Sequence, residues 1–346
     1  MRLHAFSRAK FMFTPAAVRR RSSDESHGFP SQLQLFTSRN FVFDSCFSRP
    51  WCSVTARRTA LVVTGAIGAA AALFVLHYAA FGWHQCHPPR AAITEADNAR
   101  ARATLPGFDA ASFIAPDGVT LRGWFVAPKN GVVVILTHGL GGNRASLLPD
   151  AGVMVHHGYG VLLYDSRASG ESGGELATWG ALEALDVAAA TRFVRARPGV
   201  SRVALLGFSV GASAVTRAAA NDPEVSAVVL YACWTTLREE VLYKAGHGLP
   251  LAAPAALLGF RVSGTDIDAI RPADDLPRIA PRPMLFISGG QDTDTPPEVM
   301  DRLFALASEP KRLWRLPEVG HGSYYQADPV AYERHVIEFL DGVFAH

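Results

Sequence analysis

Residues 202–220 read RVALLGFSVGASAVTRAAA. The β-branched and leucine-rich run 202–206 predicts a strand, and the alanine-rich run 212–220 predicts a helix. Between them the pentapeptide GFSVG, residues 207–211, fits the pattern G-x-S-x-G. In a strand–turn–helix context this pattern holds a serine on a sharp turn with its hydroxyl exposed, because the two small residues let neighbouring backbone approach closely. We therefore predict that Ser209 is a nucleophile.

Alternating strand and helix patterns extend outward from this stretch over residues 112–346. Continuous apolar runs, which are typical of strands buried on both faces of a sheet, occupy 132–137, 160–164, 202–207, 227–231, 283–288 and 311–316. Helical patterns occupy 147–157, 181–196, 212–220, 297–306 and 329–343. This order predicts an α/β fold with a mostly parallel, doubly wound sheet.

Two features modify the alternation. The dipeptide Asp117-Gly118 predicts a tight turn between strands 112–116 and 119–128, so the first two strands should be antiparallel. Residues 233–276 interrupt the strand–helix order and predict a small, mostly helical cap inserted in the domain.

A serine nucleophile needs a histidine as general base and an acid that orients the histidine. In this architecture the three residues follow one another as serine, acid and histidine. His321, in the glycine-flanked loop 319–323 after the last strand, is the candidate base. The loop after strand 283–288 offers two acids, Asp292 and Asp294, and their spacing alone does not choose between them.

The oxyanion that forms during attack on a carbonyl needs hydrogen-bond donors. One donor should be the backbone N–H of Val210, which follows the nucleophile. The other should come from the glycine-rich loop 137–144, THGLGGNR, and we expect it to be the N–H of Leu140. His138 precedes the glycine-rich turn, so we expect it to be structural and not a base.

Taken together, five motifs resemble those of the α/β-hydrolase superfamily, most closely its serine aminopeptidase and monoglyceride-lipase-like branch. They are HGLGG at 138–142, DSRASGES at 165–172, GFSVG at 207–211, GQDTDTP at 290–296 and GHG at 320–322. The resemblance covers about residues 112–343. It implies an α/β-hydrolase fold with Asp292 as the acid, Leu140 and Val210 as oxyanion donors, and Asp165 and Arg167 as structural anchors.

The sequence departs from the pattern of this family at two positions. Ala168 stands where glycine is usual, and Thr295 stands where valine is usual. Neither position carries the chemistry.

An apolar run precedes the domain. Residues 60–80, ALVVTGAIGAAAALFVLHYAA, contain no Lys, Arg, Asp or Glu. At about 1.5 Å per residue they span roughly 30 Å, the thickness of the hydrocarbon core of a bilayer. A buried helix of this length normally carries a polar stripe. We predict one transmembrane signal anchor over residues 59–83, with a cleaved signal peptide as the alternative.

The segments beside this run have different compositions. Residues 1–58 carry ten Lys and Arg against three Asp and Glu. They predict a basic, disordered tail, a transit peptide or a segment that precedes the true start, and the sequence does not rank these. Residues 84–111 predict a linker with a short helix around 94–103. The arginines nearest the run, Arg57 and Arg58, favour a cytoplasmic N-terminus and an extracytoplasmic catalytic domain.

Composition argues against several other classes of protein. A formal net charge of +2 does not fit a dedicated nucleic-acid binder. The four cysteines form no C-x-x-C pair, so zinc-ribbon and thioredoxin-like sites are excluded and no disulfide framework is implied. We expect no cofactor and no metal. No pattern in the chain indicates an oligomeric state.

The sequence therefore predicts a single-pass membrane-anchored serine hydrolase. It should cleave an ester or related acyl bond of a small-molecule or lipid-like acyl substrate through an acyl-enzyme on Ser209. The alternatives are a serine peptidase of the same fold and a non-catalytic binding protein that keeps the fold.

Overall fold

The computed structural model describes residues 50–246, 249 and 252–345, and it describes side chains from residue 54 onward. Most of the predicted N-terminal tail, residues 1–49, lies outside the described residues. By its internal contacts the chain divides into the units Met1–Thr59 and Ala60–His346. The second unit contains the sheet and its helices.

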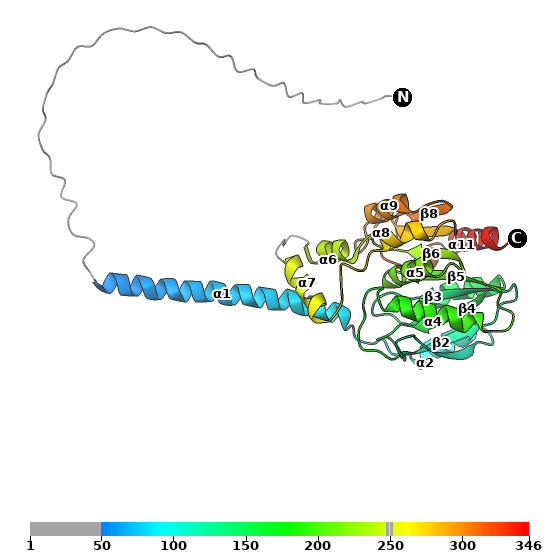
Figure 1. The fold of residues 1–346 in the computed structure, drawn as a ribbon, viewed down its shortest axis with the longest axis horizontal. Coiled ribbons are helices and arrows are strands. Elements are labelled where there is room, and N and C mark those ends of the chain that lie inside the picture. Colours follow the sequence, from blue (N-terminus) through cyan, green and yellow to red (C-terminus); the bar gives the residue numbers. More distant parts are fainter. Residues whose placement is uncertain (1–49, 247–248, 250–251, 346) are drawn as a thin grey trace, which may run out of the picture. The chain divides into compact units, whose positions relative to one another are not determined.

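A single eight-stranded sheet forms the centre of the domain, with strand order β1-β2-β4-β3-β5-β6-β7-β8 (Figure 1). Only β2 runs against its neighbours, and the other strand pairs are parallel. The strands are β1 (Asp109–Ile114), β2 (Thr120–Val126), β3 (Val132–Thr137), β4 (Gly160–Asp165), β5 (Arg202–Phe208), β6 (Val225–Tyr231), β7 (Met284–Gly289) and β8 (Lys311–Leu316). The predicted mostly parallel α/β sheet is confirmed.

Helices cover both faces of this sheet. Side chains that alternate along a strand enter different cores: Ile135 packs with α4 and α5, whereas Leu136 packs with α3 and α11. The helices of the first face are α4 (Glu183–Arg195), α5 (Val210–Asn221), α8 (Pro272–Asp275) and α9 (Pro297–Leu306). Those of the second face are α2 (Glu95–Thr104), α3 (Leu148–His156) and α11 (Pro329–Phe344). The remaining short turns are η1 (Arg144–Leu147), η2 (Leu276–Arg278) and α10 (Tyr324–Ala327).

The segment expected to be a linker, residues 84–111, is instead packed against the domain. Its helix α2 starts with a capping box, in which Thr94 Oγ1 accepts a hydrogen bond from the Asp97 N–H at 3.1 Å. Ala101 and Leu105 are completely buried in the same core as α3. The sequence misses this because a ten-residue helix with only a narrow apolar face resembles a solvated linker.

The segment predicted to be the cap contains two longer helices, α6 (Leu237–Gly246) and α7 (Ala252–Val262). They lie between β6 and β7 in the chain. Residues 247–248 and 250–251, which connect them, lie outside the described residues.

The apolar run before the domain lies in one long helix, α1 (Pro50–Cys86). Over Val54–Cys86 it is long and apolar enough to cross a membrane, with a mean hydropathy of 2.2 in its most apolar window. None of that window is buried, so the helix is not a core helix of the domain. It is a candidate membrane span.

Candidate active site

Ser209 lies on a strained turn between β5 and α5, with φ 55° and ψ −114°. The two flanking glycines explain the sequence motif. A Cβ on Gly207 would lie 2.4 Å from the carbonyl oxygen of Gly211, and a Cβ on Gly211 would lie 2.2 Å from that of Thr137. Because real side chains do not tolerate such distances, the turn requires glycine at both positions. The strain holds the serine hydroxyl at the carboxyl edge of the sheet.

The three residues of the predicted triad lie in hydrogen-bonding distance of one another. His321 Nε2 lies 3.1 Å from Ser209 Oγ, and His321 Nδ1 lies 2.8 Å from Asp292 Oδ2. With the imidazole proton on Nδ1, the ring donates to the carboxylate and accepts the hydrogen bond of the serine hydroxyl. This arrangement can transfer the serine proton to the histidine during attack.

The structure distinguishes between the two acids of the loop after β7. Asp292 is buried, and its Oδ1 accepts hydrogen bonds from the N–H groups of Asp294 and Thr295 at 2.9 and 2.8 Å. Asp294 is exposed and orients Asp292 through its backbone. Of these two acids, Asp292 alone is hydrogen-bonded to His321 in the described part of the chain.

Leu140 and Val210, the predicted oxyanion donors, line one small cavity of about 10 Å³, which has room for about one water molecule. His138 lies beside this cavity and is buried. Its Nε2 accepts the Ser166 N–H at 3.1 Å and its Nδ1 lies 2.7 Å from the Gly139 carbonyl oxygen. Burial lowers the pKa of His138, so the neutral ring holds two backbone segments together.

The block 165–172 braces the loop that carries Leu140. Asp165 is fully buried and accepts hydrogen bonds from the Arg144 backbone N–H at 2.7 Å and from its guanidinium at 2.8 Å. Arg167 pairs with Asp186 at 2.6 Å. Ala168 has a φ of 56°, which explains why glycine is usual at this position.

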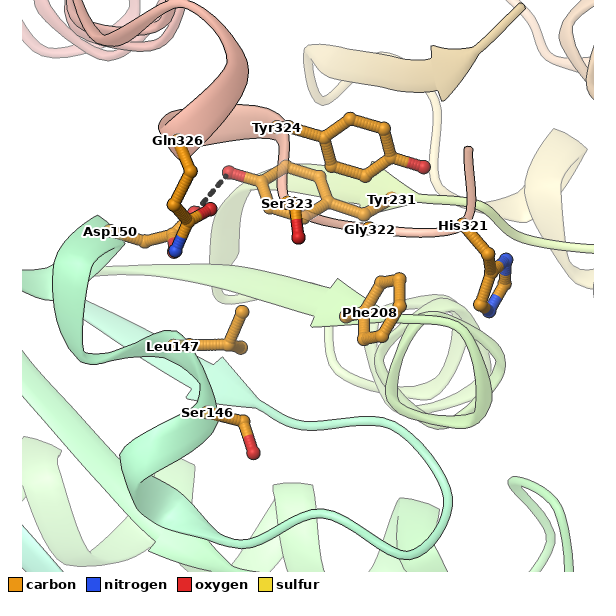
Figure 2. A pocket seen from close by; sticks show the side chains of 10 residues that line it. All are labelled: Ser146, Leu147, Asp150, Phe208, Tyr231, His321, Gly322, Ser323, Tyr324 and Gln326. Carbon is orange, nitrogen blue, oxygen red and sulfur yellow. Dashed lines mark hydrogen bonds between the residues drawn. The ribbon is translucent and has the colours of Figure 1, made fainter. Parts of the chain in front are cut away.

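A cavity of about 230 Å³ opens beside His321 and Phe208 (Figure 2). Asp150, which the sequence analysis missed, lines its far side together with Tyr231. The Tyr231 hydroxyl donates to Asp150 Oδ1 at 3.2 Å and lies 2.6 Å from the hydroxyl of Tyr332. Burial raises the pKa of Asp150 to about 6. The cavity therefore offers a titratable group near the triad.

A second cavity of about 220 Å³ lies between the cap and α9, and its lining holds three glutamates and Arg302, which pairs with Glu239 at 3.3 Å. Glu239, Glu240 and Glu298 line it together with Trp234. Burial raises the pKa of Glu240, although Lys244 Nζ lies 3.1 Å from its carboxylate. The sequence analysis did not find this cluster, because its members come from α6 and from the start of α9.

No three His, Cys, Asp or Glu side chains are grouped as a metal site within the part of the chain that the structure describes. The described arrangement offers a candidate nucleophile, a candidate base, a candidate orienting acid and two candidate backbone donors, and acyl transfer requires such a set.

Comparisons with known proteins place the chain among relatives of known family. Residues 128–258 match the family described as serine aminopeptidase, S33. The uncharacterized protein YfhR of Salmonella typhi is 31% identical over 219 residues, which are 61% of this chain and 73% of the relative. The uncharacterized protein Rv2307c of Mycobacterium tuberculosis is 32% identical over 211 residues, 59% of this chain and 69% of the relative.

Solved structures share the fold. The Pyrococcus furiosus esterase Pf2001 aligns with a TM-score of 0.64 at 24% identity, covering 75% of this chain and 98% of that chain. The α/β hydrolase GrgF from Penicillium aligns with a TM-score of 0.57 at 24% identity, covering 69% of this chain and 99% of that chain. With the family match and the relatives above, the chain belongs to the α/β-hydrolase superfamily, and the family match supports a hydrolase of this fold.

Proposed function

We propose that the protein is a serine hydrolase that cleaves an ester or a related acyl bond through an acyl-enzyme on Ser209. The observation that carries the proposal is the chain of two contacts from Ser209 Oγ to His321 at 3.1 Å and from His321 to Asp292 at 2.8 Å. The strained turn under Ser209 supports it further, because a serine that only packed would not need such a backbone.

The proposed reaction has two halves. In the first, Ser209 Oγ bonds to the carbonyl carbon while His321 Nε2 takes the hydroxyl proton, and Asp292 stabilises the imidazolium. The carbonyl oxygen becomes an oxyanion, to which the N–H groups of Leu140 and Val210 donate. The carbon–oxygen bond to the alcohol then breaks, and the alcohol leaves with the proton from His321. In the second half a water molecule takes the place of the alcohol and releases the acid.

A fluorophosphonate probe tests this proposal on the full chain in detergent. We expect covalent labelling of the wild type, no labelling of Ser209→Ala, and labelling of Ser213→Ala, which alters a buried serine on the same helix. A folded wild type that does not react would refute the nucleophile. A panel of p-nitrophenyl esters of graded chain length then measures which acyl group the site prefers.

The acidic cavity beside the cap supports a second candidate function, a serine peptidase that holds a substrate amino group. Glu298 and the carboxylates of Glu239 and Glu240, which also pair with Arg302 and Lys244, would provide the negative charge for this group. Aminoacyl p-nitroanilides with a free and with an acetylated amino group test the idea. A peptidase should prefer the free amine, and Glu240→Gln should lower that preference, whereas an esterase should cleave neither anilide at a useful rate.

The proposal includes anchoring of the enzyme in a membrane by α1. The most apolar window of α1 is not buried by protein, and an apolar helix is stable when lipid surrounds it. The full chain should stay in the pellet after carbonate extraction of membranes, and its release would refute anchoring. We further propose that the catalytic domain lies on the extracytoplasmic side. Protease added to intact cells or spheroplasts should then digest the domain, and protection until lysis would reverse the orientation.

A further inference from the structure

Two glycines lie where α1 meets the cap helix α7. A Cβ on Gly82 of α1 would lie 2.0 Å from the carbonyl oxygen of Ala256 on α7. A Cβ on Gly259 of α7 would lie 2.0 Å from the carbonyl oxygen of Ala79 on α1. The two backbones are therefore in direct contact, as Figure 1 shows for α7 and the C-terminal part of α1. We call this contact the anchor–cap joint.

Only one face of α1 takes part in the anchor–cap joint. Phe74 and Tyr78 are partly covered and Gly82 and Cys86 are buried, and these four residues follow one another at intervals of four. Such spacing lines one face of a helix. Leu76, between them, remains 64% exposed. The last turns of α1 therefore have one face against protein and the rest free for lipid.

The end of α1 is also bonded to the hydrolase domain. The Trp179 indole N–H donates to the carbonyl oxygen of Gln85 at 3.0 Å, and the Ala177 N–H donates to that of Cys86 at 2.8 Å. A helix that ends in such bonds holds the domain in a defined position and does not act as a flexible tether.

The inner face of α7 continues toward the catalytic residues. Phe260 of α7 is buried with its ring 5.8 Å from that of Trp179, which in turn lies 5.5 Å from Trp234. The same apolar cluster includes Val210 and has Leu140 packed against it. The inner face of α7 thus packs into the apolar cluster that lies beside the proposed active site.

The outer face of α7 leaves apolar side chains uncovered, since Leu258 is 46% and Val262 is 71% exposed. The joint fixes the depth at which they lie. The run 60–80, which matches the thickness of the hydrocarbon core, ends just before Trp83, His84 and Gln85, and α7 touches α1 at Ala79 and Trp83. If α1 spans a bilayer, α7 lies at the boundary between hydrocarbon and headgroups, where exposed leucine and valine are stabilised by lipid.

We propose that the anchor–cap joint holds the outer face of α7 against the bilayer, so that the site receives acyl esters that stay dissolved in the membrane. The proposal rests on the proposed function, namely a serine hydrolase anchored by α1. The partner of this surface is the lipid bilayer itself, and the substrate class is an ester whose acyl chain partitions into lipid.

Fluorescence depth measurements test the surface without any need for catalysis. The full chain with Cys46→Ser and Cys52→Ser receives an environment-sensitive dye at Val262→Cys and is reconstituted in phosphatidylcholine vesicles. We expect quenching by brominated lipids and a blue-shifted emission. The same dye at Val330→Cys, an equally exposed valine on α11, should show neither. Equal behaviour at the two positions would overturn the docking.

Glycine variants test the consequence for activity. Gly82→Ala and Gly259→Ala introduce the clashing Cβ atoms, whereas Gly65→Ala and Gly68→Ala are matched controls with nothing within 4 Å. Alanine has a higher helix propensity than glycine at all four positions, so any loss in the joint variants comes from the clash between α1 and α7. We expect the joint variants to lose up to about a hundredfold in kcat/KM on a long-chain ester embedded in vesicles, as misplacement of a substrate by about 1 Å would cause. The controls should not change.

A water-soluble short-chain ester and the fluorophosphonate probe separate the two proposals. Joint variants should keep labelling and short-ester hydrolysis close to the wild-type level. If they lose both ester activities equally, the joint is only structural and the inference is wrong. If the wild type itself is not labelled, the proposed function fails, and the depth measurement still decides whether α7 meets the bilayer.

Discussion

Asp150 should make the stability of the fold depend on pH, and the replacement Asp150→Asn should remove that dependence. The side chain is only 5% exposed, and burial raises its pKa from 3.8 to about 6. A difference of about two pKa units corresponds to about 3 kcal/mol. This is the order of the cost of keeping the carboxylate ionised in the folded protein.

The sign of the effect follows from which state binds the proton more tightly. Because the pKa is higher in the folded state, the folded protein binds more protons than the unfolded chain between about pH 4 and pH 6. The free energy of unfolding therefore falls as pH rises through this window and stays low above it. Asp150→Asn keeps an oxygen that can accept from Tyr231 but cannot ionise. We expect equal stability near pH 4 and an advantage approaching about 3 kcal/mol for the variant at pH 8.

Urea titration of the full chain in detergent, followed by pulse proteolysis at several pH values, measures this difference. Asp109→Asn, an exposed aspartate at the start of β1, is the matched control and should show no such trend. A difference between wild type and Asp150→Asn that does not grow between pH 4 and pH 7 would refute the reasoning. An Asp150→Asn variant that is less stable than the wild type at pH 8 would also refute it, because the tyrosine hydroxyls would then stabilise the Asp150 carboxylate enough to offset its burial.

Three further substitutions follow from the site. Asp292→Asn should lower ester turnover by about four powers of ten, because the histidine loses its orienting carboxylate, while Asp294→Asn should stay within a few-fold of wild type by the same spectrophotometric assay. Gly211→Ala places a Cβ 2.2 Å from the Thr137 carbonyl and should abolish fluorophosphonate labelling, whereas Gly342→Ala, with open space around it, should not. Ala168→Gly relieves a positive φ and should raise the free energy of unfolding by about 1 kcal/mol in urea titration without change in turnover; a loss of stability would contradict the strain.

The parts of the fold that follow from local patterns could be predicted from the sequence. The run 132–137 coincides with β3 because a parallel strand buried on both faces has to be apolar throughout. The candidate triad could also be proposed from the sequence, since the order of its residues and the carboxyl ends of parallel strands restrict where they lie. Asp165 and Arg167 likewise took the bracing positions that the motif implies.

The residues that sequence reasoning missed depend on partners far away in the chain. Asp150 looks like an ordinary polar position of a helix, and only Tyr231 and Tyr332 make it a buried acid. Gly82 looks like one more small residue of an apolar helix, and only α7 gives it a partner. No window of the sequence contains both sides of such a contact, so periodicity cannot find it.

Close backbone approach is the physical requirement that links the nucleophile turn and the anchor–cap joint. In each place a glycine is required because a carbonyl oxygen occupies the position of its Cβ, at Gly211 from Thr137 and at Gly82 from Ala256. A contact between two backbones does not change when a nearby side chain changes its rotamer, because the distance depends on backbone atoms alone. The apolar cluster around Trp179 lies between the two places, with Val210 beside the serine turn and Phe260 on α7. A substrate would then approach the candidate triad from the side on which α1 holds α7.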